Sequence, residues 1–478
     1  MPPIAGLTSD SREVLPGFAY FAIPGTRLDG HSFIPQAIEK GAATIVAEKV
    51  VVGLTVPLIR VPSSRRALAE AAAFWYGEPT KDLNVVGITG TNGKTTTSYL
   101  LRQVWEALGI SSGLIGTIEC WVGDTRESST LTTPDPMTVQ RLFSDMKAAQ
   151  VSVAAMEVTS IALDQCRAHG TKFRVGVFTN LTHDHLDYHF DMASYYAAKL
   201  KLFTDFPLQA AVINIDDPYG QRLAKEEISG KVLTFALDRT ADFSARSIRL
   251  EKSGIFAEIE TPEGAMRLVS PLIGRHNLSN CFSALGALYA LGVPLNRAIE
   301  ALKFAPGAPG RLERVAIPKN QPHVFVDYAH TPDALENVLG ALATFRRNQP
   351  GRLITVFGCG GDRDKAKRSR MAQIASRFSD VTIATSDNPR TENPDAILND
   401  IEAGIDNEKT EYHREINRRA AIHLALELGK PEDIILVAGK GHETHQILGR
   451  EEFPFDDRVV VRDYYEIASP KGVATPLK

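Results

Sequence analysis

The sequence predicts an α/β fold of three domains, and three observations support this prediction. Short apolar segments alternate with stretches of helical periodicity, which is typical of βαβ units around a mostly parallel sheet. The 478 residues leave room for about three domains. Two segments rich in Gly and Pro, 77–80 and 306–310, interrupt the alternation. We therefore expect domains at 1–80, 81–310 and 311–478.

The elements follow from the apolar pattern in chain order. In the first domain we expect strands at 18–23, 43–47 and 58–61 and a helix at 64–76. In the second we expect strands at 85–89, 153–158, 175–179, 210–215 and 232–236, helices at 96–108 and 194–203, and an antiparallel flap within 244–272. The third domain restarts the βαβ rhythm, with strands at 324–326, 353–357, 381–384 and 434–437.

Composition excludes several classes of protein. With 44% hydrophobic and 23% charged residues and a net charge of −4, the chain has no electrostatic signature of nucleic-acid binding. The four cysteines have no paired spacing, which argues against disulfides and zinc modules. No basic-then-apolar leader and no apolar run of membrane-spanning length is present. We expect a cytoplasmic monomer without membrane insertion.

A nucleotide triphosphate site is predicted by the segment Gly87-Ile-Thr-Gly-Thr-Asn-Gly-Lys-Thr95. It lies between an expected strand and an expected helix, so backbone N–H groups can converge on phosphate where the helix dipole favours negative charge. Lys94 adds a cation, and Thr95 is placed to bind a Mg²⁺ ion held by the same phosphates. The first glycine is one position earlier than in the general P-loop pattern.

Polar residues follow two further strands of the second domain. Glu157 ends the strand at 153–158, and it is either an anchor for the nucleotide Mg²⁺ or an exposed loop glutamate. The loop at 180–189 holds three histidines and two aspartates in seven residues, which favours a Mg²⁺ or Mn²⁺ site with one ligand from this loop. By pattern alone, Lys199 and Lys201 are solvent-exposed helix residues.

Four strands of the third domain also end in polar segments. These segments begin at Asp327, Gly358, Asp387 and Gly439, and they alternate basic and acidic side chains with glycines. Because the carboxyl ends of parallel strands meet at one edge of a sheet, we expect these groups to bind one small molecule. Arginine pairs with a carboxylate and glutamate with an ammonium, so the pattern favours a zwitterion.

Ordered motifs along essentially the whole chain resemble the Mur ligase family, and within it the ligases that add the third residue of the peptidoglycan stem peptide. The motifs are Asp10-Ser-Arg12, Thr-Gly-Thr-Asn-Gly-Lys-Thr-Thr at 89–96, Thr132-Thr-Pro134, Asp184-His-Leu-Asp-Tyr-His189, Gly274-Arg-His-Asn-Leu-Ser-Asn280, Pro309-Gly-Arg-Leu-Glu313, Asp327-Tyr-Ala-His-Thr-Pro332 and Asp387-Asn-Pro-Arg390.

The resemblance implies a small N-terminal α/β UDP-binding domain, a central P-loop domain with a parallel sheet, and a C-terminal Rossmann-like domain. The implied ATP contacts are Gly90, Thr91, Asn92, Gly93, Lys94, Thr95, Thr96, Asn280, Arg311 and Asp327. The implied contacts to UDP-N-acetylmuramoyl-L-alanyl-D-glutamate are Ser11, the segment 26–28, Thr132, Thr133, Thr159, Gln165 and Arg167. The implied contacts to the added amino acid are Arg363, Asp387, Asn388, Pro389, Arg390, Gly439 and Glu443.

The resemblance also implies the reaction: ATP-dependent amide formation through an acyl phosphate, with two Mg²⁺ ions. Lys199 matches the lysine that this family carbamylates with CO₂, and the carbamate would hold the second Mg²⁺ together with Glu157 and His185. The Asp-Asn-Pro-Arg motif goes with meso-diaminopimelate, whose distal carboxylate can pair with Arg390. L-Lysine would leave that guanidinium unpaired. An L-lysine-adding relative, a folylpolyglutamate synthetase and a nucleotide-dependent switch without ligation chemistry remain alternatives.

Overall fold

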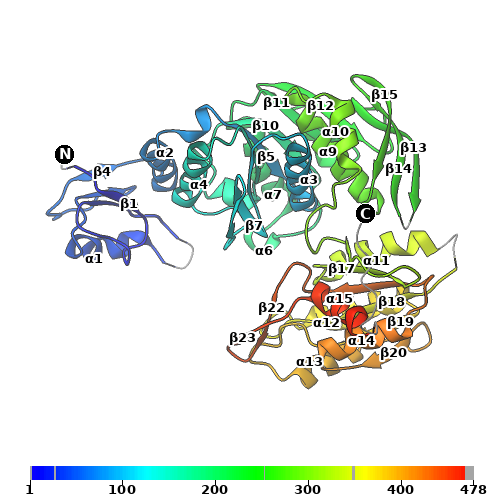
Figure 1. The fold of residues 1–478 in the computed structure, drawn as a ribbon. Helices are drawn as coiled ribbons and strands as arrows, with labels where there is room; N and C mark the ends of the chain where they lie inside the picture. Colours follow the sequence, from blue (N-terminus) through cyan, green and yellow to red (C-terminus); the bar gives the residue numbers. More distant parts are fainter. Residues whose placement is uncertain (1–2, 26–27, 252, 347–349, 469–478) are drawn as a thin grey trace. The chain divides into compact units, whose positions relative to one another are not determined.

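Parallel strands with helices between them form most of the chain, and Figure 1 shows this alternation in the computed structural model. The structure describes residues 3–25, 28–251, 253–346 and 350–468. It divides into two units, one with residues 1–247, 257–269 and 276–305, the other with residues 248–256, 270–275 and the chain from 306 onward. The two predicted domain boundaries, after residues 80 and 310, stay a prediction.

The first 76 residues fold around a parallel sheet with the strand order β1-β2-β3-β4. Its elements are β1 (Gly6–Thr8), β2 (Phe18–Phe21), a 3-10 turn (Gly30–Phe33), α1 (Ile34–Glu39), β3 (Thr44–Ala47), β4 (Leu58–Arg60) and α2 (Ser64–Trp75). Ser63 begins α2 by accepting a hydrogen bond from the Arg66 N–H, which satisfies an amide that has no partner inside the helix. The predicted strands and the predicted helix of this region are confirmed to within two residues.

The central region is built on an eleven-stranded sheet with the order β15-β14-β13-β12-β11-β10-β5-β9-β6-β7-β8. Its strands are β5 (Asn84–Thr89), β6 (Ser112–Ile115), β7 (Glu119–Val122), β8 (Thr125–Ser128), β9 (Val153–Glu157), β10 (Phe173–Phe178), β11 (Ala210–Asn214), β12 (Lys231–Ala236), β13 (Phe243–Glu251), β14 (Gly254–Thr261) and β15 (Gly264–Ser270). The helices are α3 (Lys94–Ala107), α4 (Pro136–Ala148), α5 (Ser160–Asp164), α6 (Leu186–His189), α7 (Met192–Thr204), α8 (Pro218–Leu223), α9 (Arg275–Ala290) and α10 (Leu295–Leu302).

Strand β5 is the centre of this sheet, because it pairs in parallel with both β9 and β10. The carboxyl ends of these three strands therefore meet at one edge, which gathers the residues that follow them. At the far end of the sheet, β14 and β15 are joined by only two residues, a connection that antiparallel strands allow and parallel strands do not. The predicted antiparallel flap is thus confirmed.

Two hairpin strands of the central sheet differ from the prediction. β7 pairs antiparallel with β6 and with β8, at the edge opposite the flap. All four residues of β8 are exposed. This strand is therefore kept in the sheet by backbone hydrogen bonds to β7, without burial of apolar side chains. Strand β8 therefore lacks an apolar pattern, whereas β7 is largely apolar but only four residues long.

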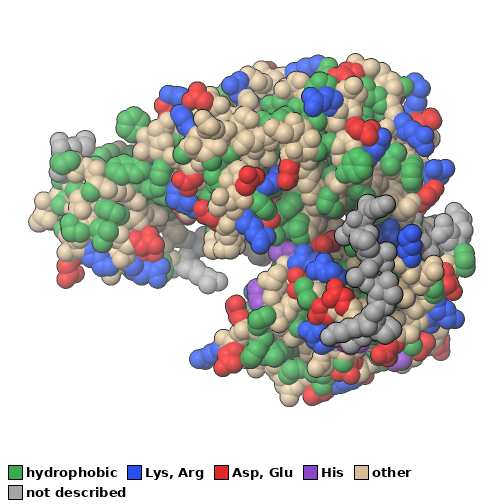
Figure 2. All heavy atoms as spheres, in the orientation of Figure 1, with side chains coloured by type: hydrophobic (Ala, Val, Ile, Leu, Met, Phe, Trp, Pro, Cys, Tyr) green, Lys and Arg blue, Asp and Glu red, His purple; other side chains and the backbone are tan. Residues whose placement is uncertain are grey.

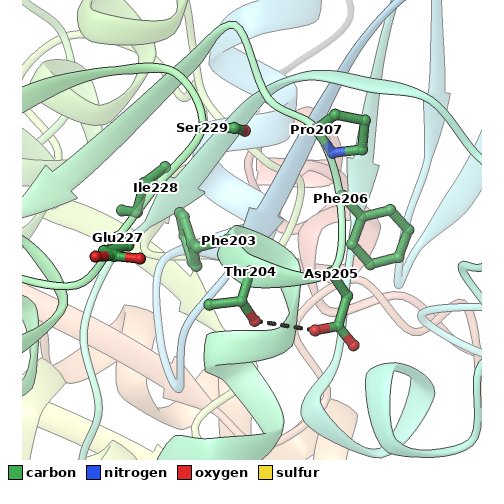
Figure 3. A pocket seen from close by; sticks show the side chains of 8 residues that line it. All are labelled: Phe203, Thr204, Asp205, Phe206, Pro207, Glu227, Ile228 and Ser229. Atoms are coloured by element: carbon green, nitrogen blue, oxygen red, sulfur yellow. Dashed lines mark hydrogen bonds between the residues drawn. The ribbon is translucent and has the colours of Figure 1, made fainter.

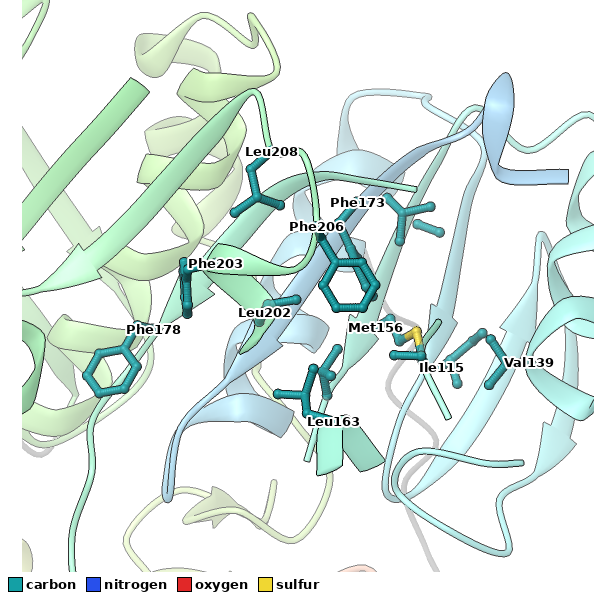
Figure 4. Packing of buried hydrophobic residues seen from close by; sticks show 14 of the residues in the cluster. Ile115, Val139, Met156, Leu163, Phe173, Phe178, Leu202, Phe203, Phe206 and Leu208 are labelled. Carbon is teal, nitrogen blue, oxygen red and sulfur yellow. The ribbon is translucent and has the colours of Figure 1, made fainter. Parts of the chain in front are cut away.

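An aromatic core fixes helix α7 on the sheet. Phe173 and Phe178 of β10 lie edge-on to Phe206 and Phe203, at centroid distances of 5.2 and 6.4 Å, and Figure 4 shows these rings packed together. A Cβ atom at Gly87 in β5 would lie 2.8 Å from the ring of Phe173 in β10 and 3.2 Å from Leu202 Cδ1 in α7. A glycine at this position therefore lets α7, which carries Lys199, pack closely against the central strand.

The second unit holds a six-stranded sheet with the order β16-β17-β21-β18-β19-β20. Its elements are β16 (Glu313–Arg314), β17 (His323–Asp327), α11 (Pro332–Arg346), β18 (Leu353–Phe357), α12 (Ala366–Phe378), β19 (Val381–Ala384), α13 (Pro394–Glu402), β20 (Glu411–Arg414), α14 (Arg418–Leu428), β21 (Ile434–Ala438), the hairpin β22 (His445–Leu448) and β23 (Glu451–Pro454), and α15 (Asp457–Ala468). The four predicted strands are confirmed as β17, β18, β19 and β21. The pairs β17–β21, β21–β18 and β18–β19 are all parallel.

Candidate active site

The predicted phosphate loop joins the end of β5 to the start of α3. Gly90 and Gly93 have positive φ angles of 151° and 89°. A Cβ atom at Gly90 would lie 1.9 Å from Thr179 Oγ1, and one at Gly93 would lie 2.4 Å from Asn280 Oδ1. Only glycine fits at these two positions. The loop thus exposes the first N–H groups of α3, and Asn280 lies beside it.

The Lys94 side chain folds back over this loop. Its Nζ donates hydrogen bonds to the carbonyl oxygens of Gly90 and Thr91, at 2.8 and 2.9 Å. Asn180 Oδ1 accepts a hydrogen bond from the Asn92 N–H at 2.9 Å, which ties the loop to the segment after β10. Thr96 is buried in the first turn of α3. The cation therefore lies where phosphate oxygens would approach the loop.

Glu157, at the end of β9, is fully buried, so its interpretation as an exposed loop residue is wrong. Its Oε2 accepts hydrogen bonds from Thr95 Oγ1 at 2.9 Å and from Thr117 Oγ1 at 2.8 Å. Its Oε1 accepts one from the Thr117 N–H at 2.9 Å. Among the described residues no basic side chain pairs with this carboxylate. A buried carboxylate beside two threonine hydroxyls and without a counter-ion is a set of oxygen ligands suited to Mg²⁺.

Thr117 is the residue of this cluster that the sequence analysis does not identify. It lies between β6 and β7, and it also bonds Thr132 Oγ1 at 3.2 Å. Because the hydroxyl of Thr117 contacts both Glu157 and Thr132, it joins the predicted metal site to the predicted substrate site. No motif marks Thr117, and only the pairing of β6 with β9 reveals its position.

Five residues predicted to hold the sugar-peptide lie close together. Thr133 Oγ1 donates to the Glu157 carbonyl oxygen at 2.9 Å and accepts from the Thr159 N–H at 3.0 Å. Arg167 donates to Gln165 Oε1 through Nη2 at 2.6 Å and to the Thr133 carbonyl oxygen at 3.1 Å. With Thr132, these side chains form one network beside Glu157.

Lys199 is buried, which corrects its interpretation as a solvent-exposed helix residue. It is 2% exposed, and its Nζ donates to the Gly90 carbonyl oxygen at 2.9 Å. Burial and the nearby Lys94 ammonium lower the pKa of Lys199 well below its usual value. By contrast, Lys201 pairs with Asp164 at the surface, as the pattern predicts. Burial therefore makes the charged form of Lys199 less favourable than in an exposed lysine.

The side chains of the histidine-rich loop, which is predicted to supply one metal ligand, lie in different surroundings. The His185 side chain is 44% exposed, and its ring lies edge-on to Tyr195 at 6.0 Å. His189 is buried against Ser160 Oγ at 2.9 Å. No group of three His, Cys, Asp or Glu side chains able to hold a metal occurs in the described parts of the chain. The prediction of a single metal ligand from this loop stays a prediction.

In the N-terminal region, Ser11 is buried and its Oγ donates to Gln36 Oε1 at 2.7 Å. Of the segment at 26–28, residues 26 and 27 lie outside the described residues, and Leu28 is exposed. The first unit also has a cavity of about 460 Å³ at the end of α7, lined by the residues labelled in Figure 3. This cavity lies next to the starts of β11 and β12, whereas the phosphate loop follows the end of β5.

In the second unit, the predicted amino-acid ligands gather after β19 and β21. Asn388 Nδ2 donates to Glu443 Oε2 at 2.9 Å. Arg390 has a positive φ angle of 50°, and its Nη1 donates to the carbonyl oxygens of Gly361 at 3.0 Å and Asn388 at 3.4 Å. Its Nε and Nη2 have no hydrogen-bond partner among the described residues. The guanidinium is thus held by one nitrogen and keeps two for a ligand.

Asp387 and Gly439 form the wall of this cluster. Asp387 Oδ2 is buried and has no hydrogen-bond partner among the described residues. A Cβ atom at Gly439 would lie 2.5 Å from that oxygen, so a glycine is required there. Pro389, between Asn388 and Arg390 in the sequence, is buried. Arg363, two positions after Gly361, is exposed. The unpaired oxygen of Asp387 suits a cationic group of a ligand.

Asp327 ends β17, and both of its carboxylate oxygens are in use. Oδ2 accepts the Leu312 N–H at 2.6 Å and Oδ1 accepts the Ala329 N–H at 2.7 Å. Burial raises the pKa of Asp327 to about 6. The guanidinium of Arg311 lies over the ring of Tyr328, 5.1 Å from its centroid. Arg311 and Asp327 are therefore neighbours, and the nearby guanidinium opposes the rise in the pKa of Asp327.

Basic and acidic side chains are interspersed over the face seen in Figure 2, with no continuous basic surface there. Within the described residues, no helix has both the length and the apolar character to cross a membrane.

Comparisons with known proteins cover almost the whole chain. The models "Mur ligase family, catalytic domain", "Mur ligase middle domain" and "Mur ligase, glutamate ligase domain" match residues 3–76, 88–288 and 310–441. The UDP-N-acetylmuramoyl-L-alanyl-D-glutamate--2,6-diaminopimelate ligase of Gloeobacter violaceus is 45% identical over 464 residues, 96% of this chain and 93% of that protein. The ligase of the same name from Bacillus velezensis is 44% identical over 467 residues, 96% of this chain and 94% of that protein.

A solved structure of a ligase with this name is 33% identical to the chain, with a TM-score of 0.75 over 98% of this chain and 95% of that one. The chain therefore belongs to the Mur ligase family of ATP-dependent amide ligases.

Proposed function

We propose that this protein is the ATP-dependent ligase that adds meso-2,6-diaminopimelate to UDP-N-acetylmuramoyl-L-alanyl-D-glutamate in peptidoglycan precursor synthesis. The observation that carries this proposal is the 44–45% identity over 96% of the chain to two relatives of that name. The phosphate loop with Lys94 and the polar cluster around Arg390 supply chemistry suited to the two halves of the reaction.

The reaction has two steps. The γ-phosphoryl group of ATP is transferred to the γ-carboxylate of the D-glutamate residue, which gives ADP and an acyl phosphate. An amine of diaminopimelate then attacks the acyl carbon, phosphate leaves, and the nitrogen loses a proton as the amide forms. The protein acts mainly by holding these anionic groups together and neutralising their charge.

The phosphate loop is our proposed ATP site, with contacts from Gly90, Thr91, Asn92, Gly93, Lys94, Thr95 and Thr96. Lys94 Nζ is held by two loop carbonyl oxygens. We propose that it exchanges them for phosphate oxygens when ATP binds. Asn280, Arg311 and Asp327 complete the proposed nucleotide contacts.

A Mg²⁺ ion fits the oxygen ligands of Thr95 and Glu157, because the buried carboxylate has no basic partner. Such an ion neutralises phosphate charge when bound. The second proposed Mg²⁺ site uses Glu157, His185 and Lys199 as a carbamate. The low pKa of Lys199 supports this modification, since the neutral amine is the form that combines with CO₂.

Two groups of residues are proposed to bind the other substrates. Ser11, Thr132, Thr133, Thr159, Gln165 and Arg167 would bind the sugar-peptide. For diaminopimelate, we propose that Arg390 pairs with the distal carboxylate, with Arg363, Asp387, Asn388, Pro389, Gly439 and Glu443 around the zwitterion. Asp387 and Glu443 supply the negative charge that an ammonium group requires.

The experiment that tests this function measures phosphate release from ATP with each substrate omitted in turn. The proposed ligase needs both the UDP-dipeptide and meso-diaminopimelate, and the product gains one diaminopimelate residue by mass. Equal or better use of L-lysine would identify the lysine-adding relative. Phosphate release without either substrate would identify a nucleotide-dependent switch, and activity on folates would identify a folylpolyglutamate synthetase.

A further inference from the structure

Lys440 is a buried cation in the second unit to which no role has been assigned so far. It follows β21, between Gly439 and Gly441, and its side chain is fully buried. Its Nζ donates a hydrogen bond to Glu443 Oε2 at 2.9 Å and another to Asn388 Oδ1 at 3.1 Å. A buried ammonium is costly unless it is paired, so these two contacts explain why Lys440 lies inside the protein.

The contacts of Asn388 fix the orientation of its amide. Oδ1 accepts hydrogen bonds from Lys440 Nζ and from the Ile447 N–H, at 3.1 and 3.0 Å, and Nδ2 donates to Glu443 Oε2. Both lone pairs of Oδ1 are therefore used inside the protein. Asn388 can offer a ligand only its remaining N–H, so it cannot accept a hydrogen bond from an ammonium group.

The carboxylates of the cluster are therefore the groups that can accept a hydrogen bond from an ammonium group. Lys440 orients one of these carboxylates. Glu443 Oε2 accepts hydrogen bonds from both Lys440 Nζ and Asn388 Nδ2. Its Oε1 has no hydrogen-bond partner among the described residues, and the side chain is 22% exposed. Although burial opposes ionisation, the hydrogen bond from Lys440 helps to hold the pKa of Glu443 below its usual value.

We propose that Lys440 is a positioning residue of the amino-acid site: it holds Glu443 ionised, with Oε1 turned to the ammonium group of the incoming amino acid. The assignment of that site to diaminopimelate rests on the proposed function. Lys440 itself touches no substrate atom. Its effect passes through Glu443, because the Ile447 N–H still orients Asn388 when Lys440 is replaced.

The first test is Lys440→Met, which keeps the length of the side chain and removes its charge. The KM for diaminopimelate should rise about 10- to 100-fold, the range expected for the loss of a charge-assisted hydrogen bond. The kcat at saturation should change by less than about 3-fold, because the phosphate loop is untouched. Lys430→Met is the matched control, since Lys430 is exposed in the same unit, and it should leave both constants unchanged.

A second measurement separates positioning from a general loss of structure. In the Glu443→Gln background, Lys440→Met should change the KM by less than about 3-fold, since the group through which it acts is gone. In the double variant there is no Glu443 carboxylate left buried without its ammonium partner. The comparison can therefore still be made if Lys440→Met alone does not fold. An equal effect of Lys440→Met in both backgrounds would overturn the proposal.

A third measurement does not depend on the substrate. The carboxyl ¹³C signal of Glu443, identified by its absence in Glu443→Gln, should titrate at higher pH in Lys440→Met than in the wild type. His445, Tyr328 and Arg418 also act electrostatically on Glu443 and are unchanged in this comparison. If diaminopimelate does not support ligation but the signal shifts, the proposed function fails and the role of Lys440 stands. An unshifted signal would overturn the role itself.

Discussion

Replacing Arg390 by lysine should reduce the ability of the enzyme to distinguish diaminopimelate from L-lysine. Arg390 Nη1 is held by the carbonyl oxygens of Gly361 and Asn388, which leaves Nε and Nη2 for a carboxylate. These two nitrogens are on one edge of the guanidinium and can bind both oxygens of a carboxylate at once. A lysine at this position keeps the charge but offers a single nitrogen.

The expected size of the effect follows from this count of hydrogen bonds. Arg390→Lys removes one charge-assisted hydrogen bond to the distal carboxylate, which costs about 1.5–3 kcal/mol. That cost corresponds to a loss of about 10- to 150-fold in kcat/KM for diaminopimelate. L-Lysine has no distal carboxylate, so its much lower kcat/KM should stay nearly constant. The ratio of the two values should therefore fall by the same factor.

The assay is phosphate release with saturating ATP and UDP-dipeptide while each amino acid is titrated. Arg370→Lys is the matched control, because Arg370 is exposed on α12 in the same unit, and its ratio should equal that of the wild type. An unchanged ratio in Arg390→Lys would show that Arg390 does not read the distal carboxylate. The specificity would then have another source, and the argument from Arg390 would be refuted.

Three further predictions concern the nucleotide half of the site and the stability of the chain. Thr117→Val removes a hydroxyl donor from the buried Glu157 carboxylate and should lower the free energy of unfolding by about 1.5–3 kcal/mol. Thr132→Val should cost less in the same denaturant titration, because its hydroxyl bonds only Thr117, and equal losses would contradict this account. Lys199→Ala should abolish ligation, and small carboxylic acids should restore part of it if a carbamate supplies the lost charge; full activity without them would disprove the carbamate. Burial raises the pKa of Asp327 to about 6, so the folded chain holds this proton more tightly than the unfolded chain. The stability of the wild type relative to Asp327→Asn should therefore fall by about 3 kcal/mol as the pH rises from about 3 to about 7, and a constant difference would contradict the shift.

Local sequence was sufficient for the elements whose signal is contiguous. The strand, glycine turn and helix around Gly90 and Lys94 are adjacent in the chain, so the phosphate loop is predicted directly and the structure has it. Most of the buried parallel strands are equally clear, because both of their faces are covered and their apolar runs are continuous. Strand β6 is also buried and parallel to β9, but it begins with Ser112 and Gly113 and is not predicted. The edge strands β8 and β20 are polar, since pairing at an edge requires no buried face, and no pattern reveals them.

Tertiary structure decided what the polar residues do once the strands bring them together. Lys199 lies in a helix of ordinary composition, and its burial and lowered pKa follow only from the packing of α7 against β5 and the phosphate loop. Thr117 reaches Glu157 across forty positions of sequence through the pairing of β6 and β9. In the sequence, Lys440 is an ordinary lysine between two glycines. In the folded chain it is buried and donates hydrogen bonds to Asn388 and Glu443. The sequence by itself determined the fold class, the phosphate loop and the family. Burial, charge state and hydrogen-bond partners needed the folded chain, because they depend on neighbours that are distant in sequence.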